Sequence, residues 1–111
     1  MIARIWRGAT EKSRRDEYLA YLERTGVKDY AATPGNRGAY VLARDEGDRT
    51  LFTIVSLWES REAIEAFAGP DIERGVYYDE DDDFLVEKFD IEHHDVAARV
   101  DPPPIDGAPA G

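Results

Sequence analysis

Residues 51–59 read Leu-Phe-Thr-Ile-Val-Ser-Leu-Trp-Glu, and this stretch decides the expected fold. Its β-branched and aromatic residues favour a strand, in which alternate side chains face opposite sides. One set is Leu51, Thr53, Val55 and Leu57, and the other is Phe52, Ile54, Ser56 and Trp58. Both sets are largely apolar, whereas the solvated face of a sheet alternates towards polar residues. We therefore predict a strand that is buried on both faces.

The segments before this strand predict a strand, a helix and a hairpin. Residues 2–8 have the pattern of a short strand that ends at Gly8. Ser13 is expected to cap a helix that runs to about Ala32, bent or ended early at Gly26. Residues 36–45 are expected to form a second strand, which the polar turn Asp45-Glu46-Gly47-Asp48 joins to the strand at 51–59.

The segments after it predict a second helix and a last strand. Ser60 is expected to cap a helix with one apolar stripe, which Gly69-Pro70 ends. Residues 71–87 are irregular, with short helical turns at 71–76 and 83–87. Residues 88–96 have the pattern of a fourth strand.

The resulting order, β-α-β-β-α-β, predicts an α+β, ferredoxin-like fold with a four-stranded antiparallel sheet and both helices on one face. Nothing else in the chain can cover the second sheet face, so a second copy is the simplest cover and we expect a homodimer. The domain should span residues 1–96. The Pro- and Gly-rich tail, residues 97–111, is expected to be disordered or extended.

Composition excludes several classes of function. The 111-residue chain has a formal net charge of -10, which argues against binding to nucleic acid or to an anionic membrane surface. It has no cysteine, which excludes disulfides, thiolate nucleophiles and iron–sulfur clusters. No secretory signal or membrane-spanning stretch is evident, so we expect a cytoplasmic protein.

Three segments resemble the antibiotic biosynthesis monooxygenase family of dimeric α+β barrels. They are MIARIWRG (1–8), TPGNRGAYVL (33–42) and LWESREAIEAFAGPD (57–71). The most specific part is Trp-x-Ser-x-Glu-Ala-x-x-Ala-Phe, from Trp58 to Phe67. The resemblance covers residues 1–96 and implies a dimer whose two sheets form an eight-stranded barrel, with a pocket between each sheet and its helices or loops.

The resemblance leaves three functions open, because relatives differ in chemistry. The favoured one is a monooxygenase that oxidises a small electron-rich aromatic molecule with O₂ and needs no cofactor. The second is a haem-binding or haem-degrading protein. The third is a non-enzymatic dimeric module that binds a small molecule, which a pocket filled by its own side chains would favour.

Candidate site residues follow from the resemblance, residue type and strand alternation. Trp58 would line the pocket, unless it only packs the end of the sheet, and Trp6 would line the barrel or, as we favour, fill the dimer interface. Whichever of the two histidines, His93 or His94, faces the pocket would be the general base, unless both histidines are exposed or lie at the interface. The other candidates are His93 and His94 as bases, Arg4 and Arg37 as anion partners, and Phe52, Tyr40, Phe67 and Tyr77 as walls.

The signals for haem and metal are incomplete. The resemblance aligns Tyr77 with the iron-ligating histidine of haem degraders, and tyrosinate can ligate ferric haem. The asparagine that those relatives carry on the first strand is missing from residues 2–6. His93 and His94 should point to opposite faces and cannot share an ion. In the acidic run 79–83, alternate aspartates have the spacing of EF-hand calcium ligands. Phe84 stands where that loop needs a glycine and Asp90 where it needs its last glutamate, so we expect a solvated loop and no metal.

Overall fold

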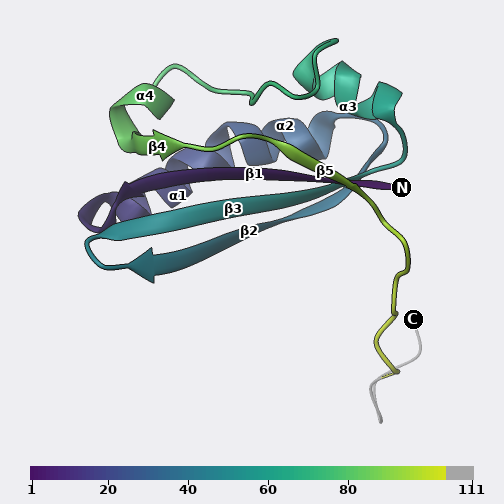
Figure 1. Ribbon diagram of the computed structural model, residues 1–111, viewed down its shortest axis with the longest axis horizontal. Coiled ribbons are helices and arrows are strands. Elements are labelled where there is room, and N and C mark those ends of the chain that lie inside the picture. Colours follow the sequence, from purple (N-terminus) through teal and green to yellow (C-terminus); the bar gives the residue numbers. More distant parts are fainter. Residues whose placement is uncertain (105–111) are drawn as a thin grey trace.

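The computed structural model describes residues 1–104 and has an α+β, ferredoxin-like fold (Figure 1). The strands are β1 (Ile2–Glu11), β2 (Asn36–Glu46), β3 (Arg49–Trp58), β4 (Leu85–Lys88) and β5 (Glu92–Asp95). The helices are the 3₁₀ turn η1 (Lys12–Arg14), α1 (Arg15–Arg24), α2 (Gly26–Ala32), α3 (Arg61–Ala68) and α4 (Asp81–Phe84). The predicted fold class is therefore confirmed.

The sheet has the order β2-β3-β1, and both β4 and β5 pair with the free edge of β1. All pairs are antiparallel, with Ile5 opposite Val55 and Gly8 opposite Phe52. The expectation that the first strand ends at Gly8 is wrong. A Cβ at Gly8 would lie 2.7 Å from the Trp6 ring, so the glycine makes room for that ring while the strand continues.

The predicted last strand, residues 88–96, is in fact two short strands, so the sheet has five strands instead of four. Lys88 lies opposite Gly8 and Glu92 lies opposite Ile5. The later strand thus advances four residues while β1 advances three, and the extra residue breaks the pairing as a bulge does.

The helix ends agree in part with the sequence. Ser60 caps α3, since its Oγ accepts a hydrogen bond from the main-chain nitrogen of Ala63 at 3.2 Å. Ser13 makes no such cap, because it lies inside η1. The long helix is interrupted at Thr25, next to the glycine where a bend or an early end was expected. The predicted turn at 83–87 is replaced by α4, which begins at Asp81.

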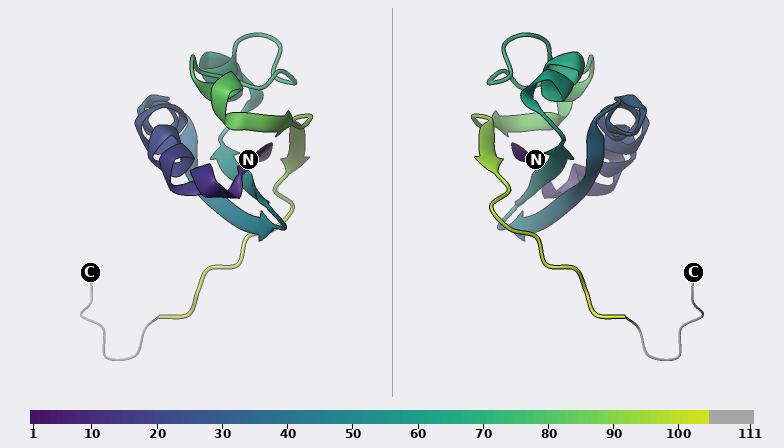
Figure 2. Two further views of the ribbon diagram at one scale, coloured as in Figure 1. Left: turned by 90° about the vertical axis from the view of Figure 1, so that its left-hand side faces the viewer. Right: turned by 90° about the vertical axis from the view of Figure 1, so that its right-hand side faces the viewer.

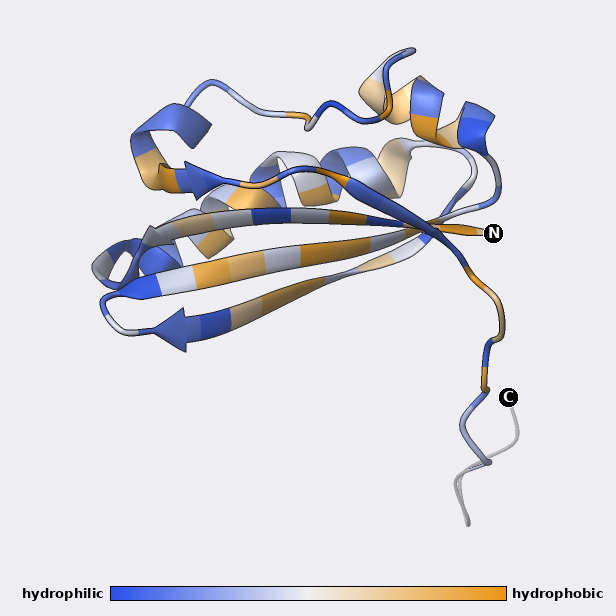
Figure 3. Cartoon of the chain, in the orientation of Figure 1, coloured by the Kyte–Doolittle hydropathy of each residue, from blue (hydrophilic) through white to orange (hydrophobic). Residues whose placement is uncertain are grey.

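The two sheet faces have different surroundings. The even-numbered side chains of β3 are buried beneath the helices, and the core includes Phe52, Trp58, Tyr18 and Ile64. The odd-numbered side chains of β3 are only half-buried, and on β2 Tyr40 and Leu42 are 68% and 51% exposed. Figure 2 shows α1 and α2 on one side of the sheet, and Figure 3 shows the apolar residues along β2 and β3. The alternation is confirmed, and one largely apolar face is open in the single chain.

Residues 97–104 form no helix or strand and are exposed. The rest of the predicted tail, 105–111, lies outside the described residues. Within residues 1–104, no helix is both long and apolar enough to cross a membrane.

Candidate functional site

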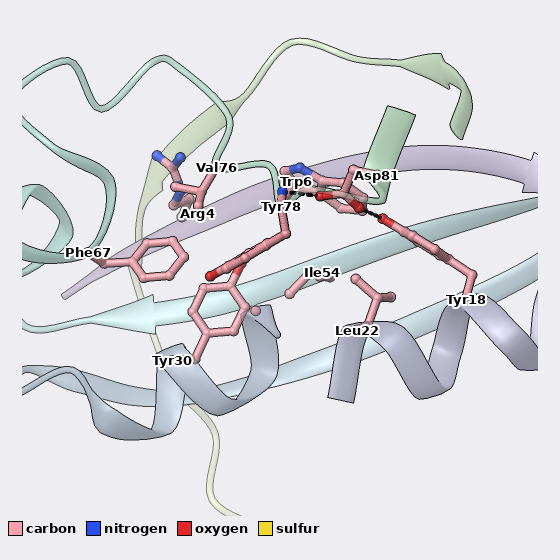
Figure 4. A pocket seen from close by; sticks show the side chains of 11 residues that line it. Arg4, Trp6, Tyr18, Leu22, Tyr30, Ile54, Phe67, Val76, Tyr78 and Asp81 are labelled. Carbon is pink, nitrogen blue, oxygen red and sulfur yellow. Dashed lines mark hydrogen bonds between the residues drawn. The ribbon is translucent and has the colours of Figure 1, made fainter. Parts of the chain in front are cut away.

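A small cavity lies between the helix-side face of the sheet, the helices α1 and α2, and the segment that joins α3 to α4 (Figure 4). Its volume is about 20 Å³, which is room for about one water molecule. Aromatic rings form most of its wall: Trp6, Tyr18, Tyr30, Phe67 and Tyr78. The cavity is thus almost filled by the protein's own side chains.

Regular geometry brings these side chains together. Arg4 and Trp6 are two residues apart on β1 and so share the face that the helices cover. Tyr18 and Leu22 are four residues apart on α1 and lie on one helix face. Tyr78 comes from the irregular segment before α4.

Arg4 is the positively charged residue that lines the cavity, and it is only 1% exposed. Its guanidinium donates to the main-chain carbonyl oxygens of Ile72 and of Arg74, the latter at 2.8 Å, and lies 2.9 Å from Nε2 of His93. Among the described residues no carboxylate forms an ion pair with it. Burial lowers the pKa of Arg4, but an arginine stays protonated. A buried positive charge with only neutral partners is costly.

His93 lies on the helix side of β5, opposite Arg4 on β1. Its pKa is lowered, first by burial and then by the positive charge of Arg4. If Nε2 accepts the guanidinium hydrogen bond, the ring proton is on Nδ1. The histidine is therefore neutral at pH 7, as a general base must be.

The pH dependence of stability checks this arrangement. In the unfolded chain His93 binds a proton near its usual pKa of about 6.5, whereas in the folded chain the pKa is lower. Below about pH 6.5 the unfolded state binds more protons, so the free energy of unfolding falls as the pH falls. We expect this fall to be smaller in His93→Gln than in wild type, measured by urea unfolding above and below that pH. The control is His94→Gln, on the other face; equal pH slopes in all three proteins would contradict the prediction.

Tyr30, Phe67 and Trp58 form an aromatic cluster beside Arg4. The Tyr30 and Phe67 ring centroids are 4.7 Å apart, and Trp58 lies 5.5 Å from Phe67. The indole nitrogen of Trp58 donates to Ser56 Oγ at 2.9 Å. Burial raises the pKa of Tyr30 to about 12, despite the nearby Arg4 and Ser56, so its hydroxyl remains protonated.

Asp81 is a site residue that the sequence did not reveal. It is 3% exposed, and it accepts hydrogen bonds from the Tyr18 hydroxyl at 2.7 Å and from the Tyr78 main-chain nitrogen at 2.5 Å. Burial and the bond to Asp81 raise the pKa of Tyr18. The expectation of a fully solvated acidic loop is therefore wrong for Asp81. Nothing in a run of five acidic residues distinguishes the one that turns inward.

Several predicted site residues lie at or directly behind the cavity. Arg4, Trp6 and Phe67 line it. Phe52 and Trp58 point to the same side of the sheet but are fully buried behind the lining residues. The favoured placement of Trp6 in the dimer interface is corrected, since its side chain lies beneath the helices and not on the open face.

Four other predicted residues lie away from the cavity. Tyr40 and His94 point to the open sheet face, because they lie opposite Val55 and Ala3. Arg37 forms a surface ion pair with Glu59. Tyr77 lies outside the cavity, 6.2 Å from the Trp6 ring between centroids. Strand alternation separates the first two from the site, which corrects the expectation that all four contribute to one pocket.

The missed residues come mainly from the helices. Tyr18 and Leu22 are apolar positions at helical spacing, a pattern that does not distinguish a site from a core, and Tyr30 was not predicted. No group of three or more potential metal ligands occurs within the described part of the chain. His93 and His94 do point to opposite faces, as strand geometry predicted.

The fold and site define a class of small α+β proteins with a small, mainly apolar cavity between sheet and helices. The sequence model of the family described as "Antibiotic biosynthesis monooxygenase" matches residues 1–71, and the chain belongs to this family. No curated protein matches the sequence.

Solved structures show the same fold at low sequence identity. A putative antibiotic biosynthesis monooxygenase from Bacillus cereus has a TM-score of 0.65 and 12% identity, covering 94% of this chain and 98% of that one. The haem degrader MhuD from Mycobacterium tuberculosis, with two haems bound, has a TM-score of 0.56 and 23% identity, covering 91% and 100%. SnoaB, a cofactor-independent oxygenase from Streptomyces nogalater, has a TM-score of 0.54 and 17% identity, covering 93% and 98%.

Proposed function

We propose that the protein is a cofactor-independent oxygenase that oxidises a small electron-rich aromatic molecule with O₂. The observation that carries the proposal is the buried Arg4, which pairs with no carboxylate of residues 1–104 and lies beside a neutral histidine and a wall of aromatic rings. The similarity to SnoaB adds support at the level of the family fold.

The reaction needs no redox group from the protein. A phenolate or enolate gives one electron to O₂, and the resulting organic radical and superoxide combine to a peroxide. Loss of water leaves a carbonyl, so that a CH₂ group and O₂ become C=O and H₂O, and O₂ accepts all four electrons. The protein must exclude water, remove a proton and stabilise the developing negative charge.

The site residues match these three tasks. The rings of Trp6, Tyr30 and Phe67 provide an apolar wall that excludes water. The positive charge of Arg4 stabilises an oxyanion. His93 does not line the cavity but contacts Arg4, which does, and we assign it the role of general base; its Nε2 becomes free for a substrate proton once the Arg4 N–H turns towards the ligand.

The cavity does not fit haem in the arrangement observed. A porphyrin is far larger than a cavity of about 20 Å³. Tyr77, the residue aligned with an iron ligand, lies outside the cavity, where the ammonium of Lys88 is 4.4 Å from the centre of its ring. Burial raises the pKa of Tyr77, which disfavours the tyrosinate form that iron requires. We therefore assign no step to haem.

One observation favours a second candidate, a module that binds a small molecule without converting it. The cavity is nearly filled by its own side chains, and a non-enzymatic binder needs no permanent room for substrate and O₂ together. This candidate uses the same residues and differs only in turnover.

We also propose that the active unit is a homodimer formed by the open sheet face. That face carries Tyr40, Leu42 and Val55, and exposed apolar patches of this kind favour association with another protein. The dimer would cover the apolar residues that the single chain leaves half-buried.

Oxygen uptake with a panel of phenols and quinols tests the function. We expect turnover by wild type, and a loss of about 10²- to 10⁴-fold in kcat/KM in His93→Gln, because general base catalysis contributes about that much. His94→Gln is the matched control and should keep its activity, since it lies on the other sheet face. Binding of phenols without any oxygen uptake would instead support the binding module. Saturable haem binding near one per chain, seen as a Soret band on hemin titration, would overturn the proposal.

A further inference from the structure

The segment between α3 and α4, residues 69–80, closes one side of the cavity through Val76 and Tyr78. It contains no helix or strand. Within the described residues, the hydrogen bonds that connect the main chain of residues 70–77 to the rest of the protein are those from Arg4 to Ile72 and Arg74. The guanidinium therefore supplies the main-chain hydrogen bonds that hold this segment, and the buried side chain of Ile72 anchors it to the core.

The end of the same segment is held by carboxylates instead. Asp81 accepts a hydrogen bond from the Tyr78 main-chain nitrogen, and Asp29 accepts one from the Tyr78 hydroxyl. The Tyr21 hydroxyl accepts one from the Glu80 main-chain nitrogen at 2.9 Å. These partners fix residues 78–80, so the stretch around Arg74 is the part of the segment that depends on Arg4.

Neutral carbonyl groups accept hydrogen bonds from a buried guanidinium but do not neutralise its charge. A carboxylate does neutralise it, and arginine binds a carboxylate through two parallel N–H donors. An anionic oxygen that reached Arg4 would compensate its charge, which the carbonyl oxygens of Ile72 and Arg74 do only in part. Such a ligand would displace them.

Displacement would also make room. The cavity of about 20 Å³ cannot admit an aromatic molecule unless part of its wall moves. The carbonyl at Arg74 lies two residues before the wall residue Val76, so its release from Arg4 frees the Val76 part of the wall, while Asp81 and Asp29 still hold Tyr78.

We propose that Arg4 is a specificity residue for an aromatic ligand with an anionic oxygen, and that the ligand displaces the carbonyls of Ile72 and Arg74 and so releases the segment around Arg74. The inference rests on the proposed function in that it assigns the substrate class of the same cavity. The two carbonyls accept hydrogen bonds from the Arg4 N–H groups that the ligand's oxygen would take over.

Binding of matched probes tests the charge requirement. The probes are 2-naphthoate, its neutral analogue 2-naphthamide, and 4-nitrophenolate, with binding measured by calorimetry. We expect naphthoate, phenolate or both to bind about tenfold to hundredfold more tightly than the amide, the usual range for a hydrogen bond to a charged group. Binding of either anion alone identifies which oxygen the site selects. Equal affinity for the amide and both anions would overturn the inference.

Trypsin reports the release of the segment, because it cleaves after arginine and must engage the Arg74 carbonyl. We expect the bound anion to increase the rate of cleavage after Arg74, measured by mass spectrometry, and the amide to leave it unchanged. Cleavage after the exposed Arg99 is the internal reference. Unchanged or slower cleavage after Arg74 with an anion bound would contradict the coupling.

Variants separate recognition from folding. Arg4→Lys keeps the charge but loses the two-donor geometry, so we expect at least a tenfold loss of affinity for the anion and none for the amide. Arg61→Gln, at an exposed arginine paired with Glu65, should change neither. If Arg4→Lys does not fold, the probe affinities and trypsin cleavage rates of the wild-type protein still decide whether the inference holds. Anion-dependent release of the segment around Arg74 without oxygen uptake would support the inference and overturn the proposed function. Oxygen uptake with neutral ligands alone would support the proposed function and overturn the inference.

Discussion

Replacing Trp58 by alanine is expected to lower the free energy of unfolding by about 3–5 kcal/mol, the usual cost of removing a buried aromatic ring. Trp58 is 0% exposed and packs against Tyr30 and Phe67, so truncation leaves a cavity in the core. Urea unfolding monitored by circular dichroism measures the change. A loss below about 1 kcal/mol, typical of exposed positions, would contradict this core role.

The control variant is Trp58→Phe, which retains a ring and removes the donor to Ser56. We expect it to cost much less than the alanine variant and to keep oxygen uptake, because Trp58 lies behind the cavity lining. A stable Trp58→Phe protein with strongly reduced turnover would instead assign Trp58 the pocket role that the family resemblance implied.

Replacing Val55 by aspartate is expected to convert the proposed dimer to a monomer. Val55 lies in the middle of the open face, opposite Ile5 on one side and Tyr40 on the other. The new carboxylate in each of the two copies would be buried in the interface, and each would cost several kcal/mol of desolvation. Sedimentation or light scattering should show a mass of twice 12.5 kDa for wild type and of 12.5 kDa for the variant.

The matched control is Ala20→Asp, which adds the same charge at an exposed position of α1. It should remain dimeric. Circular dichroism should show that Val55→Asp stays folded, since Val55 is already half-buried at most in the single chain. A wild-type mass of 12.5 kDa, or a dimeric Val55→Asp protein, would remove the open face as the interface.

The part of the fold that the sequence predicted depends on neighbours in the chain. The hairpin of β2 and β3 follows from β-branched residues on either side of a polar turn, and the Ser60 cap follows from one side chain and a nitrogen three residues on. The Ser13 cap failed for a reason outside its own segment. The Lys12 nitrogen donates to the Asp48 carbonyl at 2.8 Å, at the hairpin turn, and η1 begins at Lys12 itself.

The site was predictable to the extent that strand alternation decides it. Alternation separated His93 from His94, and the composition of the first strand suggested Arg4 as an anion partner. Alternation does not show which face of the sheet the helices cover. Trp6 was therefore expected at the open face and Tyr40 at the cavity, and the structure places each on the opposite face. Asp81 was hidden among equal neighbours, and only its contacts with Tyr18 and Tyr78 distinguish it.

The sequence by itself determined most element types and the two-sided apolar strand, because these depend on residues within about ten positions of one another. It also determined the family, through three short segments within residues 1–71. The tertiary structure alone decided which carbonyls Arg4 holds, since Ile72 and Arg74 are 68 and 70 residues away from it along the chain. It also decided that the cavity is nearly closed, because side chains from four separate segments fill it. Contacts of this range are set by how the helices and the irregular segment pack on the sheet, and no local pattern encodes them.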